Sequence, residues 1–201
     1  MNNSEKLELV TRLVVELGLS GNDVVSYLMD KGISFQEYKM PTRILPGMYV
    51  YTDGLIHPEI IPGRQIKAIV GYVKECDVLA VCLHEKKLSW ALDKQGHLTA
   101  YQWCREYAEN GVKPQEAFLA SHEQWEKVAK AFEVINSALT ALGMEKLAED
   151  GYWTSGEKSS EYDRTDVFFC LPNGKPSWES NWYCLDIPLR VRPFIQVRAH
   201  Y

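Results

Sequence analysis

The first forty residues carry apolar positions at helical spacing. Ser4 is placed to cap a helix that Gly18 ends, and Ser20 is placed to cap a second helix that Gly32 ends. Residues 1–40 are therefore predicted to form a helical hairpin that mounts or oligomerises the rest of the chain. Its apolar faces contain Leu7, Val10, Leu13, Val14, Leu17, Val24, Val25, Leu28 and Met29.

Beyond this hairpin the helical spacing gives way to the alternation of strands. The segment PGMYVYTDGLIHPEII predicts a strand, a tight turn at Asp53-Gly54 and a returning strand. Two more β-rich runs, 65–73 and 77–92, follow, with a predicted turn at Lys74-Glu75 between them. The second region, 44–201, thus begins with antiparallel strands.

Two helices come next in the pattern. One is predicted over 98–109, and a longer one runs from Ser121, with Gln124 in the reciprocal capping position, to Gly143. The chain after residue 150 returns to short strands in the segments GYWTS, TDVFFCL, NWYCLDI and RVRPFIQV, between loops rich in Gly, Ser, Pro and Asn. Strands on both sides of the helices, without a parallel βαβ alternation, indicate an α+β fold.

Composition and charge narrow the function classes. The 201 residues carry a net charge of −5, and the densest basic stretch, EKK at 85–87, is interpreted as a solvated turn. No nucleic-acid partner is expected from this charge. The apolar runs are too short to span a bilayer, and acids interrupt the N-terminal one, so neither membrane insertion nor a signal peptide is predicted. The expectation is synthesis in the cytoplasm, with virion association or non-classical export left open.

The five cysteines give no sign of a disulfide framework or a zinc site, because their number is odd and no CxxC spacing occurs. Cys76, Cys82 and Cys104 are predicted to be buried thiols. Cys170 and Cys184 fall on two late predicted strands, where they would face each other if these strands lie side by side. A disulfide between them is left open.

The sequence contains no catalytic constellation. Its five histidines include no i, i+4 pair, and it has no nucleophile elbow, GxGxxG or P-loop. Glu157, Glu161, Asp163 and Asp166 cluster without the EF-hand pattern, so a solvated acidic loop is favoured over a Ca²⁺ site. No cofactor and no enzymatic activity are expected.

Aromatic and polar residues gather between 153 and 183. Flat aromatic side chains with adaptable polar neighbours are typical of recognition surfaces. Trp153, inside YWTS, is interpreted as a core residue, whereas Trp178, between NGKP and ESN, is interpreted as a loop residue.

Several motifs of this chain occur in a fixed order between about 45 and 197. They are Thr52-Asp53-Gly54, Val70-Gly71, Leu119 with Ser121 and Trp125, Tyr152-Trp153-Thr154-Ser155, and Val191-Arg192-Pro193-Phe194. This order resembles the DUF1566 family of bacterial and phage domains, and the resemblance excludes the N-terminal helices. It departs at FLAS, where the family has Leu-Pro-Ser, and at YWTS, where a Ser-Ser ending is more common.

The resemblance implies a C-type-lectin-like fold, in which two helices flank small antiparallel sheets and the N- and C-terminal strands pair. It also implies ligand recognition without catalysis, as in adhesins, phage tail proteins and the variable proteins of diversity-generating retroelements. The Glu-Pro-Asn and Trp-Asn-Asp motifs of calcium lectins are not matched at 171–173 or 181–183. Calcium-dependent sugar binding is therefore not implied.

The sequence thus predicts a binding module for a protein or glycan ligand, with the helical hairpin at 1–40 followed by a C-type-lectin-like domain at 44–201. Homo-oligomerisation through the N-terminal helices is part of this prediction. The alternatives are a structural or assembly protein of a phage or prophage tail and, more weakly supported, an enzyme of the formylglycine-generating type. The predicted ligand-binding residues are Tyr162, Asp163, Arg164, Trp178, Glu179, Asn181 and Trp182.

Overall fold

The computed structural model describes residues 41, 43–90, 99–156 and 187–199, together with the backbone of four short strands between 164 and 184. The predicted N-terminal helical hairpin lies outside the described residues. The chain divides into two units, Met1–Tyr38 and Lys39–Tyr201, and the described residues all belong to the second unit.

A six-stranded antiparallel sheet forms the larger layer of this unit. Its strand order is β2-β1-β3-β4-β13-β6, so the last strand of the chain lies beside β4. The predicted turn at Asp53-Gly54 is confirmed: it joins β1 to β2, and Gly54 has a φ of +88°. The strands are β1 (Tyr49–Tyr51), β2 (Ile56–His57), β3 (Ile66–Lys74), β4 (Asp77–Cys82), β6 (Ala117–Phe118) and β13 (Phe194–Arg198).

A second sheet has the order β10-β9-β7-β12-β5, and a separate pair is formed by β8 and β11. The pairing of β12 with β7 is parallel, whereas β10 with β9, β9 with β7 and β12 with β5 pair antiparallel. The strands are β5 (Lys86–Leu88), β7 (Gly151–Trp153), β8 (Arg164–Thr165), β9 (Val167–Cys170), β10 (Pro176–Ser177), β11 (Tyr183–Cys184) and β12 (Leu189–Val191).

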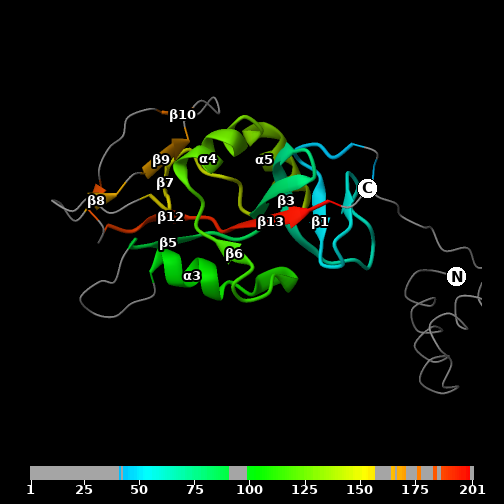
Figure 1. Ribbon diagram of the computed structural model, residues 1–201, viewed down its shortest axis with the longest axis horizontal. Coiled ribbons are helices and arrows are strands. Elements are labelled where there is room, and N and C mark those ends of the chain that lie inside the picture. Colours follow the sequence, from blue (N-terminus) through cyan, green and yellow to red (C-terminus); the bar gives the residue numbers. More distant parts are fainter. Residues whose placement is uncertain are drawn as a thin grey trace, which may run out of the picture. The chain divides into compact units, whose positions relative to one another are not determined.

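Helices cover both faces of the six-stranded sheet (Figure 1). Helix α3 (Ala100–Glu106) lies on one side and is capped by Thr99. The Thr99 side chain accepts from the backbone N–H of Gln102, and the Gln102 side chain accepts from the backbone N–H of Thr99. Helices α4 (His122–Ala129) and α5 (Phe132–Ala141) lie on the other side, and the predicted Ser121–Gln124 capping box of α4 is confirmed. A single 3-10 turn, η1 (Glu109–Gly111), follows α3.

The alternation of β4 sends its side chains to two different cores. Val78, Ala80 and Cys82 join a cluster on the α3 side that includes Trp103, Cys104 and Tyr107. Val81 points the opposite way, in register with Phe194, whose ring lies 4.7 Å from that of Trp125 on α4. The sheet is therefore apolar on both faces where helices cover it.

Two predicted helices are corrected in length. The helix from Ser121 to Gly143 is two helices, because the chain leaves helical geometry at Ala131, with φ −111° and ψ 16°. Gly143 does end the second helix, with φ +67°. The helix predicted over 98–109 ends at Glu106, because Tyr107 turns its ring edge-on to Trp103 at 5.6 Å and extends the backbone.

Two predictions about strands are also corrected, and one open question about strand pairing is answered. The turn between β3 and β4 is Glu75-Cys76 and not Lys74-Glu75, since Lys74 still pairs with Asp77. The segment RVRPFIQV is not one strand: β12 and β13 belong to different sheets and meet at 192–193. Cys170 and Cys184 also lie on strands of different sheets, so strand pairing does not bring them opposite each other.

The terminal strands are arranged differently from the implied pairing. In the six-stranded sheet, β13 lies between β4 and β6, and β3 and β4 separate it from β1. The partners of β13 are therefore β4 and β6, and not the first strand. Within the described part of the chain, no helix is long and apolar enough to cross a membrane.

Candidate functional site

The residues predicted to form the recognition face lie mostly outside the described residues. Tyr162, Asp163, Trp178, Glu179, Asn181 and Trp182 all do. Arg164 is described only as the first backbone position of β8. The structure therefore describes the framework on which these segments begin and end, and not the segments themselves.

Three strand pairings hold the ends of the predicted recognition segments. The segment 157–163 leads into β8, 171–175 connects β9 to β10, and 178–182 connects β10 to β11. Strand β9 pairs with both β7 and β10, and β8 pairs with β11. Each segment therefore starts from, or returns to, a strand that is hydrogen-bonded to a neighbour.

The chain that enters 157–163 is fixed by side chains as well as by strand pairing. Trp153 is fully buried, as predicted, and its indole N–H donates to the carbonyl of Leu88 over 2.7 Å. Trp90 donates to the carbonyl of Thr154 over 2.7 Å. The N–H of Ser155 then donates to Ala120 over 2.8 Å. These bonds attach the YWTS motif to the chain on either side of α3.

The VRPF motif contributes a buried arginine at the junction of the two sheets. The Arg192 side chain has no exposed surface, and it donates to the carboxylate of Glu85 over 2.8 and 3.1 Å. It also donates to the carbonyl of Leu83 over 2.6 Å and to that of Glu145 over 3.0 Å. A buried guanidinium needs this many acceptors, because an unpaired one would lose its hydration without replacement. Arg192 therefore joins the end of β4 to the chain after α5.

Glu85 corrects the prediction of a solvated turn at 85–87. Its side chain is only 2% exposed, whereas Lys86 and Lys87 are exposed residues of β5. Besides Arg192, it accepts from the hydroxyl of Tyr152 over 2.9 Å and forms an ion pair with Arg190. The group formed by Glu85, Tyr152, Arg190 and Arg192 is called the buried junction below.

Asp150 extends the buried junction toward solvent. It accepts from Arg190 over 3.0 Å and lies 3.4 Å from the ammonium of Lys87. Burial alone would raise the pKa of this carboxyl, but hydrogen bonds from the Gly151 N–H and from Arg190 outweigh it and hold the pKa below its usual range. Asp150 is therefore a charged partner of the arginines and not a proton donor at neutral pH.

The two buried cysteines of this part of the chain are not nucleophiles. Burial raises the pKa values of the Cys82 and Cys104 thiols well above their usual range. Both side chains pack in the α3-side core, so the prediction of buried thiols is confirmed for them. Cys76 is only partly buried. A thiol that stays protonated reacts poorly, so Cys82 and Cys104 serve as small core residues.

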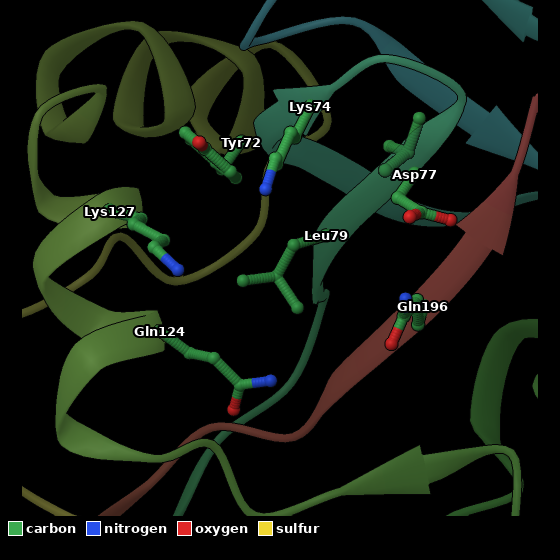
Figure 2. A pocket seen from close by; sticks show the side chains of 8 residues that line it. Tyr72, Lys74, Asp77, Leu79, Gln124, Lys127 and Gln196 are labelled. Atoms are coloured by element: carbon green, nitrogen blue, oxygen red, sulfur yellow. The ribbon is translucent and has the colours of Figure 1, made fainter.

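Two hollows open on the surface of the described residues. The first, of about 180 Å³, lies between α4 and the end of the β3–β4 hairpin (Figure 2). The second, of about 410 Å³, lies between the segment 45–49 and α5, and it is lined largely by apolar side chains. Within the described residues, no group of three or more His, Cys, Asp or Glu side chains is placed to hold a metal ion.

Comparisons with known proteins give no relative for this chain. No family model matches it, and neither a curated protein nor a solved structure does. The resemblance to the DUF1566 family therefore stays a prediction that rests on the motifs alone.

Sequence reasoning missed both the buried junction and the 180 Å³ hollow. Glu85 and Arg192 are separated by 107 positions, and no local sequence pattern around either residue predicts their contact. One signal was present: Arg192 interrupts the apolar residues of VRPF. An arginine among apolar strand positions predicts that a carboxylate or carbonyl groups from elsewhere in the chain are buried beside it as acceptors.

Proposed function

We propose that this chain is a non-enzymatic recognition module of C-type-lectin-like build, which binds a protein or a glycan through the segments between 156 and 183. The predicted contact residues are Tyr162, Asp163, Arg164, Trp178, Glu179, Asn181 and Trp182. The N-terminal residues 1–40 would mount or oligomerise it.

The observation that carries this proposal is the asymmetry between framework and segments in the late part of the chain. Trp153, Arg192 and Phe194 are buried framework residues. The loops themselves contain Ser, Asn, Gly and charged residues around Trp178 and Trp182. A rigid scaffold that carries polar and aromatic segments is the usual architecture of a binding surface.

The arrangement of the described elements supports the C-type-lectin-like build in part. Helices flank an antiparallel sheet, and the last strand, β13, returns between β4 and β6. A second sheet holds the strands β7, β9 and β10, between which the proposed recognition segments run.

The test is a binding screen of the full chain against an array of glycans and against intact bacterial cells. The double variant Trp178→Ala/Trp182→Ala should lose binding by about tenfold or more, since truncated aromatic anchors typically cost over 1 kcal/mol each. The matched control is Ile60→Ala, which removes a 46% exposed apolar side chain from outside these segments and should leave binding unchanged.

Two results would overturn the proposal. One is a folded wild-type chain that binds neither the glycans nor the cells, and the other is a double variant that binds as well as the wild type. Equal melting temperatures of wild type and variants would establish that any lost binding is not a loss of fold. Size measurement in solution with and without residues 1–40 tests the proposed oligomerisation.

A further inference from the structure

One half of the α4-side face of the six-stranded sheet is left open by the helices. Under α4 this face is apolar, with Val81 beside Phe194. Two positions further along each strand, the same face presents Leu79 and Gln196, which are register partners. A polar side chain has thus replaced an apolar one where the helix no longer covers the sheet.

A β-bulge in β3 sets which side chains reach this open half. The register moves from Val70↔Ala80 to Tyr72↔Leu79, so Gly71 is an extra residue without a partner on β4. Without the extra residue, strict alternation from Val70, which faces the α3-side core, would send Tyr72 and Lys74 into that core. The bulge turns both toward α4 and sends Val73 inward instead.

Gly71 is also the point at which the bulge meets α4. A Cβ atom added there would lie 2.9 and 3.0 Å from the two methyl groups of Val128. Only glycine allows the extra residue to pass beneath the helix at this distance. The bulge and the helix therefore fix the position of Tyr72 and Lys74 together.

These side chains and those of α4 line the hollow of about 180 Å³. In Figure 2 the ammonium groups of Lys74 and Lys127 lie on one side of Leu79, and the carboxylate of Asp77 and the carboxamide of Gln196 lie on the other side. Leu79 is largely buried and forms an apolar floor. The hollow therefore has a basic side, an apolar floor and an acidic side.

The two charges at the hairpin end do not neutralise each other. Lys74 and Asp77 are register partners on adjacent strands, and both are exposed. Nevertheless, neither makes an ion pair with any described residue. Their charged groups are available to a ligand, which distinguishes them from the charges of the buried junction.

Lys127 completes the basic side from α4. Its ammonium is held by Glu123 one turn earlier, over 2.6 Å, and lies 5.7 Å from the centre of the Tyr72 ring. The hydrogen bond with Glu123 also raises the pKa of Lys127. Lys127 is thus a positioned cation, whereas Lys74, whose charge contributes to the lowered pKa of Glu123, makes no ion pair among the described residues.

We propose that this hollow binds a small zwitterion of the amino-acid type, whose carboxylate is held by Lys74 and Lys127 and whose ammonium group is held by Asp77. Leu79 and the aliphatic parts of the lysine side chains contact the short apolar body of the ligand. Gln124 and Gln196 supply carboxamide groups that donate to the carboxylate and accept from the ammonium group.

The arrangement favours a zwitterion over a phosphate or a simple anion. The hollow presents no arginine fork, the group that matches a phosphate in two-point contact. The carboxylate of Asp77 would repel a ligand that carries only negative charge. A ligand with both charges leaves neither Lys74 nor Asp77 without a partner.

The test uses glycine, L-alanine, L-valine, L-leucine and L-phenylalanine as probes, each compared with its N-acetyl and its carboxamide derivative. Ligand-observed NMR and calorimetry on the full chain are expected to detect binding of at least one free amino acid at about 10 mM. Each derivative lacks one charge and should bind about tenfold more weakly or worse, as expected for the loss of a charge-assisted hydrogen bond.

Variants locate the binding site independently of the derivatives. Lys74→Ala and Asp77→Asn should each weaken binding by about tenfold. The matched control is Lys130→Ala, which removes an exposed lysine next to α4 that does not line the hollow, and it should leave affinity unchanged. The proposal is overturned if no free amino acid binds, if the derivatives bind equally well, or if Lys130→Ala weakens binding as much as Lys74→Ala. Because these variants change none of the residues proposed for recognition, their results are distinguishable from those of the Trp178→Ala/Trp182→Ala test above.

Discussion

The described part of the chain contains two groups of opposite charges that differ in almost every physical respect. In the buried junction, Glu85 and Arg192 have 2% and 0% of their side chains exposed, and each has several hydrogen-bond partners. At the open hollow, Lys74 and Asp77 are exposed register partners without an ion pair among the described residues. The first group is satisfied within the fold, whereas the second is not.

This difference shows how burial decides what a charge does. A buried charge must be paired, because the cost of leaving it unpaired in a protein interior is several kcal/mol. Its partners therefore become part of the fold. An exposed charge keeps its water, contributes about 0–1 kcal/mol to stability, and stays free to exchange that water for a ligand. The variants below test this division, from the largest expected effect to the smallest.

The largest effect is expected from Arg192→Met. The substitution leaves the carboxylate of Glu85 buried with fewer donors, together with the carbonyls of Leu83 and Glu145 that Arg192 satisfies. Breaking a buried pair in this way costs about 3–5 kcal/mol. Urea unfolding followed by circular dichroism measures the loss. Arg198→Met at the exposed end of β13 is the control and should stay within about 0.5 kcal/mol of the wild type; a similar loss in both variants would contradict the special role of Arg192.

Gly71→Ala should have the next largest effect, about 1–3 kcal/mol, because the new methyl group would collide with Val128. The bulge residue belongs to the hollow side of the comparison: it lies under α4 and directs Tyr72 and Lys74 to the open hollow. The double variant Gly71→Ala/Val128→Ala should be less destabilised than the sum of the single variants, since the collision is removed. Additive losses in urea unfolding would show that steric contact with α4 is not the cause.

Acid should weaken the fold through carboxylates whose pKa is lowered in the folded chain. Two of them are Asp150, beside the buried junction, and Glu116. For Glu116, burial alone would raise the pKa, but the Lys113 N–H and the Lys67 ammonium at 2.5 Å outweigh it and lower the pKa. A carboxyl whose pKa is lower in the folded than in the unfolded chain stabilises the fold at pH values above the usual carboxyl pKa. This contribution to the free energy of unfolding is lost as the pH falls through the folded-state pKa.

Urea unfolding at a series of pH values between about 6 and about 3 measures this loss. The double variant Asp150→Asn/Glu116→Gln should be less stable at neutral pH and should lose less stability on acidification than the wild type. An unchanged pH dependence in the double variant would exclude these two carboxyls as its source.

The smallest effect on stability is expected at the hollow. Lys74→Ala and Asp77→Asn each remove an exposed charge that has no ion pair within the described residues, so the unfolding free energy should change by less than about 0.5 kcal/mol. The measurement is the same urea unfolding as for Arg192→Met. A loss above about 1 kcal/mol would mean that these charges belong to the fold and not to a binding site.

Sequence patterns predicted the local features of this fold well. The Asp53-Gly54 turn, the capping box at Ser121 and the stop at Gly143 all depend on residues within a few positions of one another. The burial of Trp153 was also predicted. The predicted recognition residues and the hairpin at 1–40 lie outside the described residues, and they stay predictions.

The features that the sequence did not predict depend on contacts between distant segments. No proline or glycine marks the break between α4 and α5 at 130–131, where both helices pack on β3 of one sheet. The division of RVRPFIQV between β12 and β13 follows from the pairing of one half with β5 and the other half with β4. Glu85, interpreted from its neighbours as solvated, is buried because Arg192 meets it from 107 positions away.

By itself, the sequence determined the order of strands and helices, the turn at Asp53-Gly54, the capping box at Ser121 and the net charge of −5. These properties follow from residue type and short-range spacing, which act along the chain. Only the tertiary structure decided which charges are buried and which open onto the hollow. Lys74 reaches the hollow because Gly71 adds one residue beneath α4, and a one-residue change of register moves every following side chain to the opposite face of a strand.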